Sequence, residues 1–450
     1  MAPQTRSSRN GSPTPPASAA AIITPTIADD TILVDDKLYS WKKLAATHPG
    51  GELFVKSFAG RDATEAFMSY HRRLFPHETQ AHALIGSTPS ISNANHTDDY
   101  LELCSEVDKV LPKHKSFAPL SYWIKIVVLL TFTVSLEVYM HTTGSYTWYL
   151  SAVLGLCFAF IGLNVQHDAN HGSVSRSAWV NRFLGMSQNY IGGSAVSWVH
   201  QHVVQHHIHC NDVHEDPDIM GGSMIRINPL RPLRSNQAFQ YLYVFVMIAG
   251  FGFKQIFTTM GDTLAGKNFT SYSKPLRADH LVFELATSVV FLVRWVGLPV
   301  ISALARGDSP VMTMLNTAPI YMVAGYYLAF FFIISHNFDG VHAFDRSKHA
   351  PNDTSPDSNN RFLYRQVVSS SNVGGPLLAF MNGGLNYQIE HHLFPRVQHS
   401  HYATIAPIVR EFCRRKNIPY RHFPTIAENM ISCSKHLFTM GHCENKEMIE

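Results

Sequence analysis

Five stretches of this chain are apolar enough, over a long enough run, to cross a lipid bilayer. The hydrocarbon core is roughly 30 Å thick, so a spanning helix needs about 20 mostly apolar residues. The stretches are residues 122–140, 146–165, 239–257, 281–304 and 315–335. Tyr and Trp recur near their ends, as they do at membrane interfaces. A single soluble core does not need five such helices, so the sequence predicts a membrane protein rather than a large soluble α-protein.

The rest of the composition narrows the class. A formal net charge of +3 without a basic stripe argues against a nucleic-acid partner. The six cysteines show no CxxC spacing, which argues against a disulfide scaffold or a Cys-rich zinc finger and favours a reducing compartment. The 26 histidines are the unusual feature, because imidazole is a common metal ligand. The mean hydropathy of −0.03 averages the apolar stretches against polar segments.

The polar segments divide the chain. Residues 1–30 are rich in Ser, Thr, Ala and Pro and are expected to be a disordered tail. The longest apolar run in this tail is too short for a signal peptide, so we expect the N-terminus in the cytosol. The remaining expected units are a small mixed domain at 31–90, a linker at 91–118, a membrane domain at 119–440 and a C-terminal tail at 441–450.

A histidine pair lies in the small mixed domain. His48 begins the sequence HPGG, where Gly50 and Gly51 permit a tight turn, and His71 follows the run GRDATEAF. Two imidazoles on opposite faces of a porphyrin fill both axial positions, and such an iron moves electrons without binding oxygen. HPGG, then GxDAT, then the second histidine resembles cytochrome b5-type haem domains over about residues 31–90. The resemblance implies haem b, with His48 and His71 as the axial ligands.

Three further clusters of histidines, here called boxes, lie next to apolar stretches or after them. In boxes one and two, two histidines are spaced i, i+4, which places them on one face of a helix where they can hold one metal centre. Seven box histidines exceed the needs of one tetrahedral zinc, and such nitrogen-rich ligation favours two irons. Box one is His167 and His171, box two is His202, His206 and His207, and box three is Gln388, His391 and His392. Candidates for orienting these imidazoles are Asp168, Asn170, Asp216, Asp218 and Glu390.

The boxes together with the haem pattern resemble the membrane fatty-acyl desaturases, over about residues 31–440. QIEHH in box three and an N-terminal cytochrome b5-type domain are similar to the front-end desaturases, which insert a double bond between an existing one and the carboxyl end. HDANHG, GGLNYQIEHHLFP and PYRHFPTIAENM support the resemblance. It implies a di-iron centre held by the seven histidines and by an additional ligand before box three, where His336 stands. Box two has three residues between His202 and His206, where many front-end relatives have two and some algal and protist Δ4 enzymes have three.

The boxes must meet on one membrane face, so an even number of crossings separates them. We therefore expect 239–257, with Gly250, Gly252 and Lys254, to lie in the interface, and the other four stretches to span. Lys125 and Glu137 are costly members of the first span. The expected fold is multidomain: a small α+β cytochrome b5-like haem domain fused to an all-α membrane desaturase body with four transmembrane helices and a cytosolic di-iron cap. The resemblance implies a multi-pass endoplasmic reticulum protein with both termini cytosolic.

The expected reaction is O2-dependent insertion of a cis double bond. Electrons pass from NADH through a separate cytochrome b5 reductase to the haem and then to the two irons, and the substrate is a polyunsaturated acyl-CoA or acyl-phospholipid within the membrane lipids. The boxes and the C-terminus lean towards a Δ5 enzyme. Alternatives are a Δ4, Δ6 or Δ8 front-end desaturase, a sphingolipid desaturase, a fatty acyl hydroxylase and, from another class, a membrane-anchored b5-type electron carrier. A zinc hydrolase is disfavoured because HExxH is absent.

Overall fold

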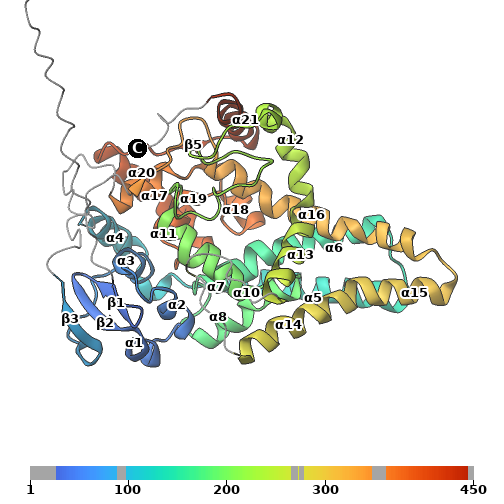
Figure 1. Ribbon diagram of the computed structural model, residues 1–450, viewed down its shortest axis with the longest axis horizontal. Helices are drawn as coiled ribbons and strands as arrows, with labels where there is room; N and C mark the ends of the chain where they lie inside the picture. The colour runs from blue at the N-terminus through green and yellow to red at the C-terminus, as the bar shows by residue number, and fades with distance from the viewer. Residues whose placement is uncertain (1–26, 89–97, 265–271, 273–277, 347–360, 444–450) are drawn as a thin grey trace, which may run out of the picture.

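The computed structural model describes residues 27–88, 98–264, 272, 278–346 and 361–443. The two expected tails, 1–30 and 441–450, lie mostly outside this part of the chain. An N-terminal unit (residues 27–88) packs against a larger helical body, and long helices extend from that body in one direction (Figure 1).

The N-terminal unit is the small mixed domain that the sequence predicts. Its three strands form an antiparallel sheet in the order β1-β2-β3. Asp35 and Asp36 join the first two strands with φ angles of 45° and 62°, left-handed values that a two-residue hairpin turn requires. The elements are β1 (Thr31–Val34), β2 (Lys37–Ser40), α1 (Trp41–Thr47), α2 (Glu52–Ser57), α3 (Thr64–His71), the short turn η1 (Ala81–Ala83) and β3 (Leu84–Ser87).

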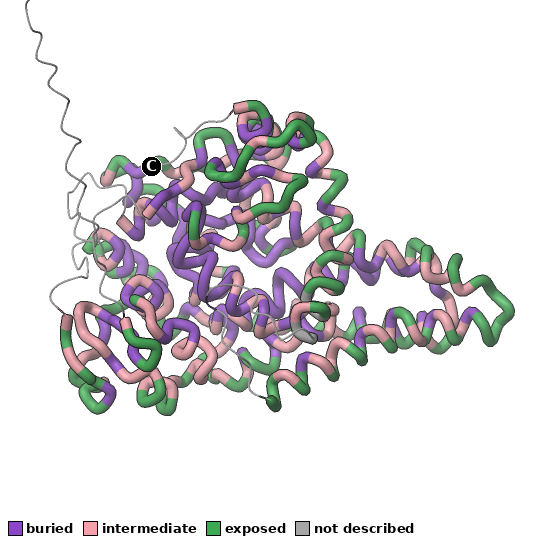
Figure 2. Tube along the Cα trace, viewed as in Figure 1, coloured by how far each residue is buried: buried purple, intermediate pink, exposed green. Residues whose placement is uncertain are grey.

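Four apolar helical stretches run alongside one another and project from the body (Figure 1). Large apolar side chains such as Val128, Val289 and Leu315 are exposed, as expected for surfaces that contact lipid. Exposed residues recur along the projecting helices (Figure 2). The stretches are α5 (Leu120–Thr143); α6 (Trp148–Ile161) continuing through the π-helix η4 (Gly162–Gln166) into α7 (His167–Asn170); α14 (Ala278–Leu292) continuing through the π-helix η8 (Val293–Gly297) into α15 (Leu298–Arg306); and α16 (Pro310–His336).

A fifth stretch, Ser235–Thr258, is also long and apolar enough to cross a membrane. It consists of η6 (Ser235–Phe239), α12 (Gln240–Met247), η7 (Ile248–Gly250) and the start of α13 (Phe251–Leu264). Figure 1 shows α12 running steeply across the direction that the four projecting helices share. Length and composition alone therefore give five candidate spans where four were expected from the sequence, and the interfacial position of this stretch stays a prediction.

The charged residues of the projecting helices have partners. Glu137 accepts from Arg294 at 2.6 Å and from the Tyr190 hydroxyl at 2.7 Å. Lys125 donates to the Asn164 side chain at 2.8 Å and contacts His399 at 3.0 Å. Pairing offsets the cost of placing charge among apolar helices.

The remaining helices form the body around the ends of these stretches. The segment expected as a linker includes α4 (Asp98–Val110), whose Tyr100, Leu103 and Val107 pack in the same core cluster as Phe362 and Ile405. This helix is therefore part of the body. The other elements are α4 (Asp98–Val110), η3 (Lys113–Lys115), α8 (Ala178–Gly185), α9 (Ser187–Tyr190), α10 (Ala195–Trp198), the π-helix η5 (Val199–His206), α11 (His207–His209), α17 (Phe362–Val368), β4 (Asn372–Val373), α18 (Pro376–Asn382), α19 (Gln388–Leu393), η10 (His399–His401), α20 (Tyr402–Arg415), β5 (His422–Phe423) and α21 (Ile426–His442).

A largely buried ion pair joins the N-terminal unit to the body. The Glu65 carboxylate of α3 lies 2.6 Å from Arg365 of α17 and 3.4 Å from Arg346. Burial alone would raise the pKa of Glu65, but the two guanidinium groups outweigh it and lower the pKa to about 2. The ion pair thus attaches the N-terminal unit to the body through α3, the helix that also carries His71.

Adding a methyl group at a close backbone contact should destabilise the packing of the helix that carries His336. A Cβ on Gly325 of α16 would overlap the backbone nitrogen of Gly252 in α13, so the two backbones touch. We expect Gly325→Ala to destabilise the protein by roughly 1–3 kcal/mol through overpacking. Thermal unfolding in detergent measures this. Gly250→Ala is the control, because nothing lies within 4 Å of its Cβ position, and equal melting of both variants would contradict the prediction.

Neutralising Glu65 should weaken the attachment of the N-terminal unit. Glu65→Gln leaves Arg365 buried without its charge partner, which costs roughly 3 kcal/mol. Because the folded pKa is depressed, the stabilisation is present above the ordinary pKa of 4.5 and is lost as the pH falls towards about 2. Hydrogen exchange of α3 and α17 reports the loosening. Glu52→Gln removes a surface pair with Lys56 and should leave exchange unchanged. Slow exchange in both variants would refute the role of Glu65.

Candidate metal centres

The structure brings together all seven box histidines and His336, which we call the histidine cluster. Every member is buried, with at most 7% of its surface exposed. They come from α7, η5, α11, the C-terminal end of α16 and α19. Segments that are more than 200 residues apart in the sequence therefore meet at the ends of the projecting helices, as the sequence predicts. The cluster consists of His167, His171, His202, His206, His207, His336, His391 and His392.

The cluster divides into two neighbouring ligand groups. In each group four potential ligand atoms lie within 4.8 Å of one another. His207 lies between the groups, with ring centroids 4.5 Å from His391 and 4.4 Å from His392. Two metal positions side by side fit this arrangement. The first group is His167, His171, His202 and His391, and the second is His206, Cys210, His336 and His392.

Box two lies on a π-helix, where the sequence analysis expects an α-helix. A π-helix closes its hydrogen bonds from i to i+5 and so holds one more residue in the turn. This accommodates the third residue between His202 and His206. Their rings remain neighbours at 5.3 Å, but each belongs to a different four-residue group. The two histidines also form a third possible ligand group with Asp218, so the expected pairing on one metal stays a prediction.

Hydrogen bonds at Nδ1 orient several of these rings. His206 donates to Asp216 at 3.0 Å, His392 to the Gln366 side chain at 3.0 Å and His336 to the Ser369 carbonyl at 3.0 Å. His391 Nδ1 lies 3.1 Å from the Tyr402 hydroxyl. The opposite nitrogens, Nε2 of His167, His171, His206 and His391, are buried without a partner in the described residues. Buried nitrogens gathered within two ligand groups fit metal ions, because an unsatisfied buried acceptor is otherwise costly.

The sequence found some of the orienting residues. Asp216 contacts His206 as expected, and Asp218 lies 3.4 Å from the same ring. Asp168 instead pairs with His399, Asn170 with Gln166, and Glu390 with Asn372 and Tyr420. Gln366, Ser369 and Tyr402 carry no spacing signal relative to the boxes, so sequence reasoning missed them.

Protonation also suits metal binding. Burial lowers the pKa of the His171, His202, His207, His391 and His392 imidazoles well below their ordinary value, which keeps them neutral. Burial would also lower the pKa of His206, but Asp216 and Asp218 outweigh it and raise the pKa to about 9. A metal at Nε2 would displace that extra proton.

Two further side chains border the second group. Gln388 Nε2 lies 2.9 Å from His336 Nε2 and 3.4 Å from His392 Nε2, so the first residue of box three stands between two cluster histidines. Cys210, which the sequence analysis did not select, lies 3.6 Å from His336. Burial raises the pKa of the Cys210 thiol well above its ordinary value.

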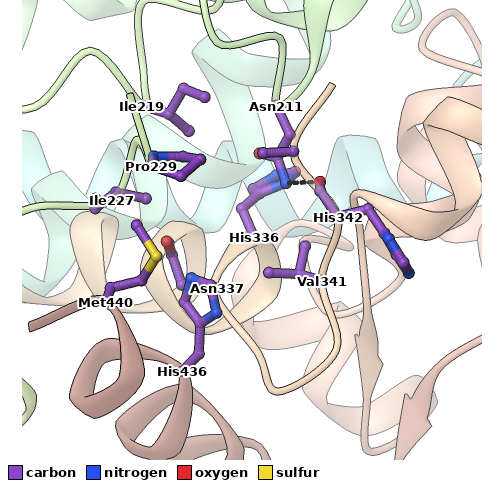
Figure 3. A pocket seen from close by; sticks show the side chains of 11 residues that line it. Asn211, Ile219, Ile227, Pro229, His336, Asn337, Val341, His342, His436 and Met440 are labelled. Carbon is purple, nitrogen blue, oxygen red and sulfur yellow. Dashed lines mark hydrogen bonds between the residues drawn. The ribbon is translucent and has the colours of Figure 1, made fainter. Parts of the chain in front are cut away.

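A small pocket lies beside the histidine cluster, and His336 forms part of its lining. Ile219, Val341, His436 and Met440 surround it, and Asn211 donates to the His342 carbonyl at its rim (Figure 3). The pocket is mostly apolar in its lining and lies between α16 and α21.

The second predicted site is the histidine pair of the N-terminal unit. The rings of His48 and His71 lie 6.2 Å apart, which leaves room for a metal bonded to both at about 2 Å per bond. Each Nδ1 donates to a carbonyl, that of Gly51 for His48 and that of Phe67 for His71, so each Nε2 is free to bind. A Cβ at Gly50 would crowd the His48 ring at 2.9 Å. Burial lowers the pKa of His71 to about 4 and that of His48 in the same direction. Both rings fit haem ligation.

Comparison with known proteins agrees with both sites. Residues 144–424 match the family described as "Fatty acid desaturase", and residues 28–99 match "Cytochrome b5-like Heme/Steroid binding domain". This chain belongs to the fatty acid desaturase family. It is similar to the acyl-lipid (7-3)-desaturases of Diacronema lutheri, at 43% identity over 92% of this chain and 90% of the relative, and of Rebecca salina, at 42% over 92% and 91%. It is also similar to Delta(5) fatty acid desaturase A of Dictyostelium discoideum, at 27% over 92% and 91%.

Membership of this family makes the protein an oxidoreductase with an N-terminal cytochrome b5 domain and a helical desaturase body. The family implies iron for the histidine cluster and haem for the N-terminal pair. The assignment of individual ligands in this desaturase stays a prediction, which the buried, unpartnered imidazole nitrogens support.

Loss of the Asp216 carboxylate should reduce iron binding. Asp216 holds His206, and substitution of such an orienting partner typically weakens metal binding roughly 10- to 100-fold. We expect Asp216→Asn to retain less iron per haem, measured by mass spectrometry of the metal and haem absorbance. Asp345→Asn is the control, because Asp345 is also a buried carboxylate beside a histidine, His214, outside the cluster. Equal iron in the two variants would contradict the role of Asp216.

Proposed function

We propose that this desaturase inserts a cis double bond into a lipid-bound polyunsaturated acyl chain, between an existing double bond and the carboxyl end. The observation that carries the proposal is the pair of adjacent ligand groups, buried where the apolar helices end, in a chain that also holds a haem-type histidine pair. The histidine cluster is the catalytic centre, and its ligands are the eight histidines, with Gln388 beside them.

The division of labour follows from the chemistry. Bound iron supplies the activation of O2, which no amino-acid side chain can supply. The protein orients the imidazoles, keeps them neutral and excludes bulk water from the cluster, whose members are at most 7% exposed. Forming one double bond removes two electrons and two protons from the acyl chain. Reduction of O2 to two waters takes four electrons, so two further electrons must arrive through the haem.

The electron source and the location complete the proposal. NADH and a separate cytochrome b5 reductase are the donors to the haem, as the resemblance implies. The apolar helices are inserted in the endoplasmic reticulum membrane with both termini in the cytosol, where NADH is available. The four projecting stretches span the bilayer, and α12 lies in the interface.

The position of the new double bond follows the more similar relatives. Relatives at 43% and 42% identity are acyl-lipid (7-3)-desaturases, whereas the Delta(5) fatty acid desaturase A is at 27%. A (7-3) enzyme counts three carbons towards the carboxyl end from a double bond at carbon 7, which makes it a Δ4 enzyme. The wide spacing in box two is shared with Δ4 enzymes too. We therefore propose Δ4 regiochemistry in place of the Δ5 preference of the sequence analysis, with an acyl lipid as the carrier.

Expression in yeast fed single polyunsaturated acids tests this proposal. We expect acids with a double bond at carbon 7 to gain one at carbon 4 in the lipid fraction, as read by gas chromatography and mass spectrometry. Conversion only of acids with a double bond at carbon 8 would refute the Δ4 assignment. No conversion of any acid, with the haem absorbance present, would refute the desaturase proposal.

Substitution of a cluster histidine should separate catalysis from haem binding. His391→Ala removes a member of the first ligand group, and we expect product to fall below detection while the haem spectrum is retained. His442→Ala, at an exposed position of α21, is the control and should keep wild-type conversion. Wild-type conversion by the His391 variant would favour the alternative of an electron carrier whose histidines take no part in chemistry.

A further inference from the structure

Tyr70 links the two candidate metal centres through a single side chain. It precedes His71 in α3, so its backbone is bonded directly to an expected haem ligand. Its ring extends from the N-terminal unit into the body, where it lies 6.3 Å from the His171 ring with an angle of 10° between the planes. His171 belongs to the first ligand group of the histidine cluster.

The Tyr70 hydroxyl makes two hydrogen bonds that define its direction. It donates to the Val203 carbonyl at 3.0 Å, in the middle of box two. Having used its only proton there, it accepts from Nδ1 of His171 at 3.3 Å. This leaves Nε2 of His171 unprotonated and facing the cluster, where it has no partner in the described residues. Tyr70 therefore orients one box histidine and is anchored to a second box.

We propose that Tyr70 is the positioning residue that couples the haem to the histidine cluster for electron transfer. The inference rests on the proposed function. The path runs from His71 through one peptide unit to the Tyr70 ring and across one hydrogen bond to His171. Electron transfer slows steeply with distance and with breaks in bonded contact, so a short path that contains one hydrogen bond favours transfer.

The redox step is balanced without further reagents. With haem and iron bound, each transfer would oxidise the haem iron from ferrous to ferric and reduce one cluster iron from ferric to ferrous. No covalent bond forms or breaks, and Tyr70 itself stays in its reduced, protonated state. Two such transfers supply the two external electrons that each double bond requires.

A second tyrosine provides a control that separates the loss of electron transfer from the loss of attachment between the N-terminal unit and the body. Tyr100 of α4 also bridges the N-terminal unit and the body, because its buried hydroxyl contacts the Ser69 carbonyl at 3.4 Å and the Leu393 carbonyl at 2.8 Å. Among the described residues, neither its hydroxyl nor its ring contacts a cluster imidazole. Tyr100→Phe is therefore a matched control, in which a bridging hydroxyl is lost at the same interface.

The test uses the full-length protein in lipid nanodiscs with its acyl-lipid substrate. The haem is reduced anaerobically with NADH and the reductase, mixed with oxygenated buffer, and its reoxidation is followed by stopped-flow absorbance. We expect Tyr70→Phe to slow the reoxidation per iron-loaded molecule roughly 10-fold or more, as substitution of an orienting partner does. Tyr100→Phe should keep the wild-type rate. Haem spectrum and iron content are measured for every variant.

A second measurement separates electron delivery from damage to the metal site. All centres are first reduced with dithionite and a small mediator, so that the cluster receives electrons without the haem, and product is then measured after a single addition of O2. We expect Tyr70→Phe to form nearly the wild-type amount of product per iron in this experiment.

Three results would overturn the inference: wild-type reoxidation in Tyr70→Phe, equal slowing in Tyr100→Phe, or equal loss of single-turnover product after chemical reduction. A wild-type protein that reoxidises its haem but forms no unsaturated product would instead refute the proposed function.

Discussion

The burial of eight imidazoles in one small volume is the constraint on which the rest of this structure depends. A buried ring nitrogen without a partner is costly, and four Nε2 atoms of the cluster have none among the described residues. Metal ions are the partners that satisfy several such nitrogens at once. The helices that carry the boxes must therefore end at a common point, and the residues that hold each Nδ1 must surround them. Asp216, Gln366 and Ser369 do this from three different segments.

The attachment of the N-terminal unit to the body follows from the need to bring the haem close to the histidine cluster. A fused electron donor is useful only if its haem lies close to the histidine cluster. Glu65, with its pKa lowered to about 2 by Arg346 and Arg365, holds α3 against the body by charge. Tyr70 and His71 follow on the same short helix, so the ion pair and the proposed electron path share one rigid element. Docking and coupling are thus parts of one interface.

Much of the fold could be predicted from local sequence. Apolar runs of spanning length identified the projecting helices. The spacing of the HPGG and GxDAT patterns and of the second histidine identified the N-terminal unit. The π-helix η5 was harder to predict from the sequence. Its hydrogen bonds from i to i+5 depend on the contacts that its histidines make in the folded protein. The stretch 239–257 illustrates a similar limit: its length allows a span, whereas its direction depends on the close contact of Gly252 with α16.

By itself, the sequence indicated which histidines are candidate metal ligands and predicted two kinds of centre, since His spacing and count depend only on the chain. It also determined that the chain has stretches long and apolar enough to cross a membrane, because about 20 apolar residues are recognisable without a structure. Only the tertiary structure decided which histidines lie together in one ligand group, which side chains hold them, and that Tyr70 reaches His171. These features join residues far apart in the chain, such as Tyr70 and His171 or His392 and Gln366, and no local period encodes such a contact.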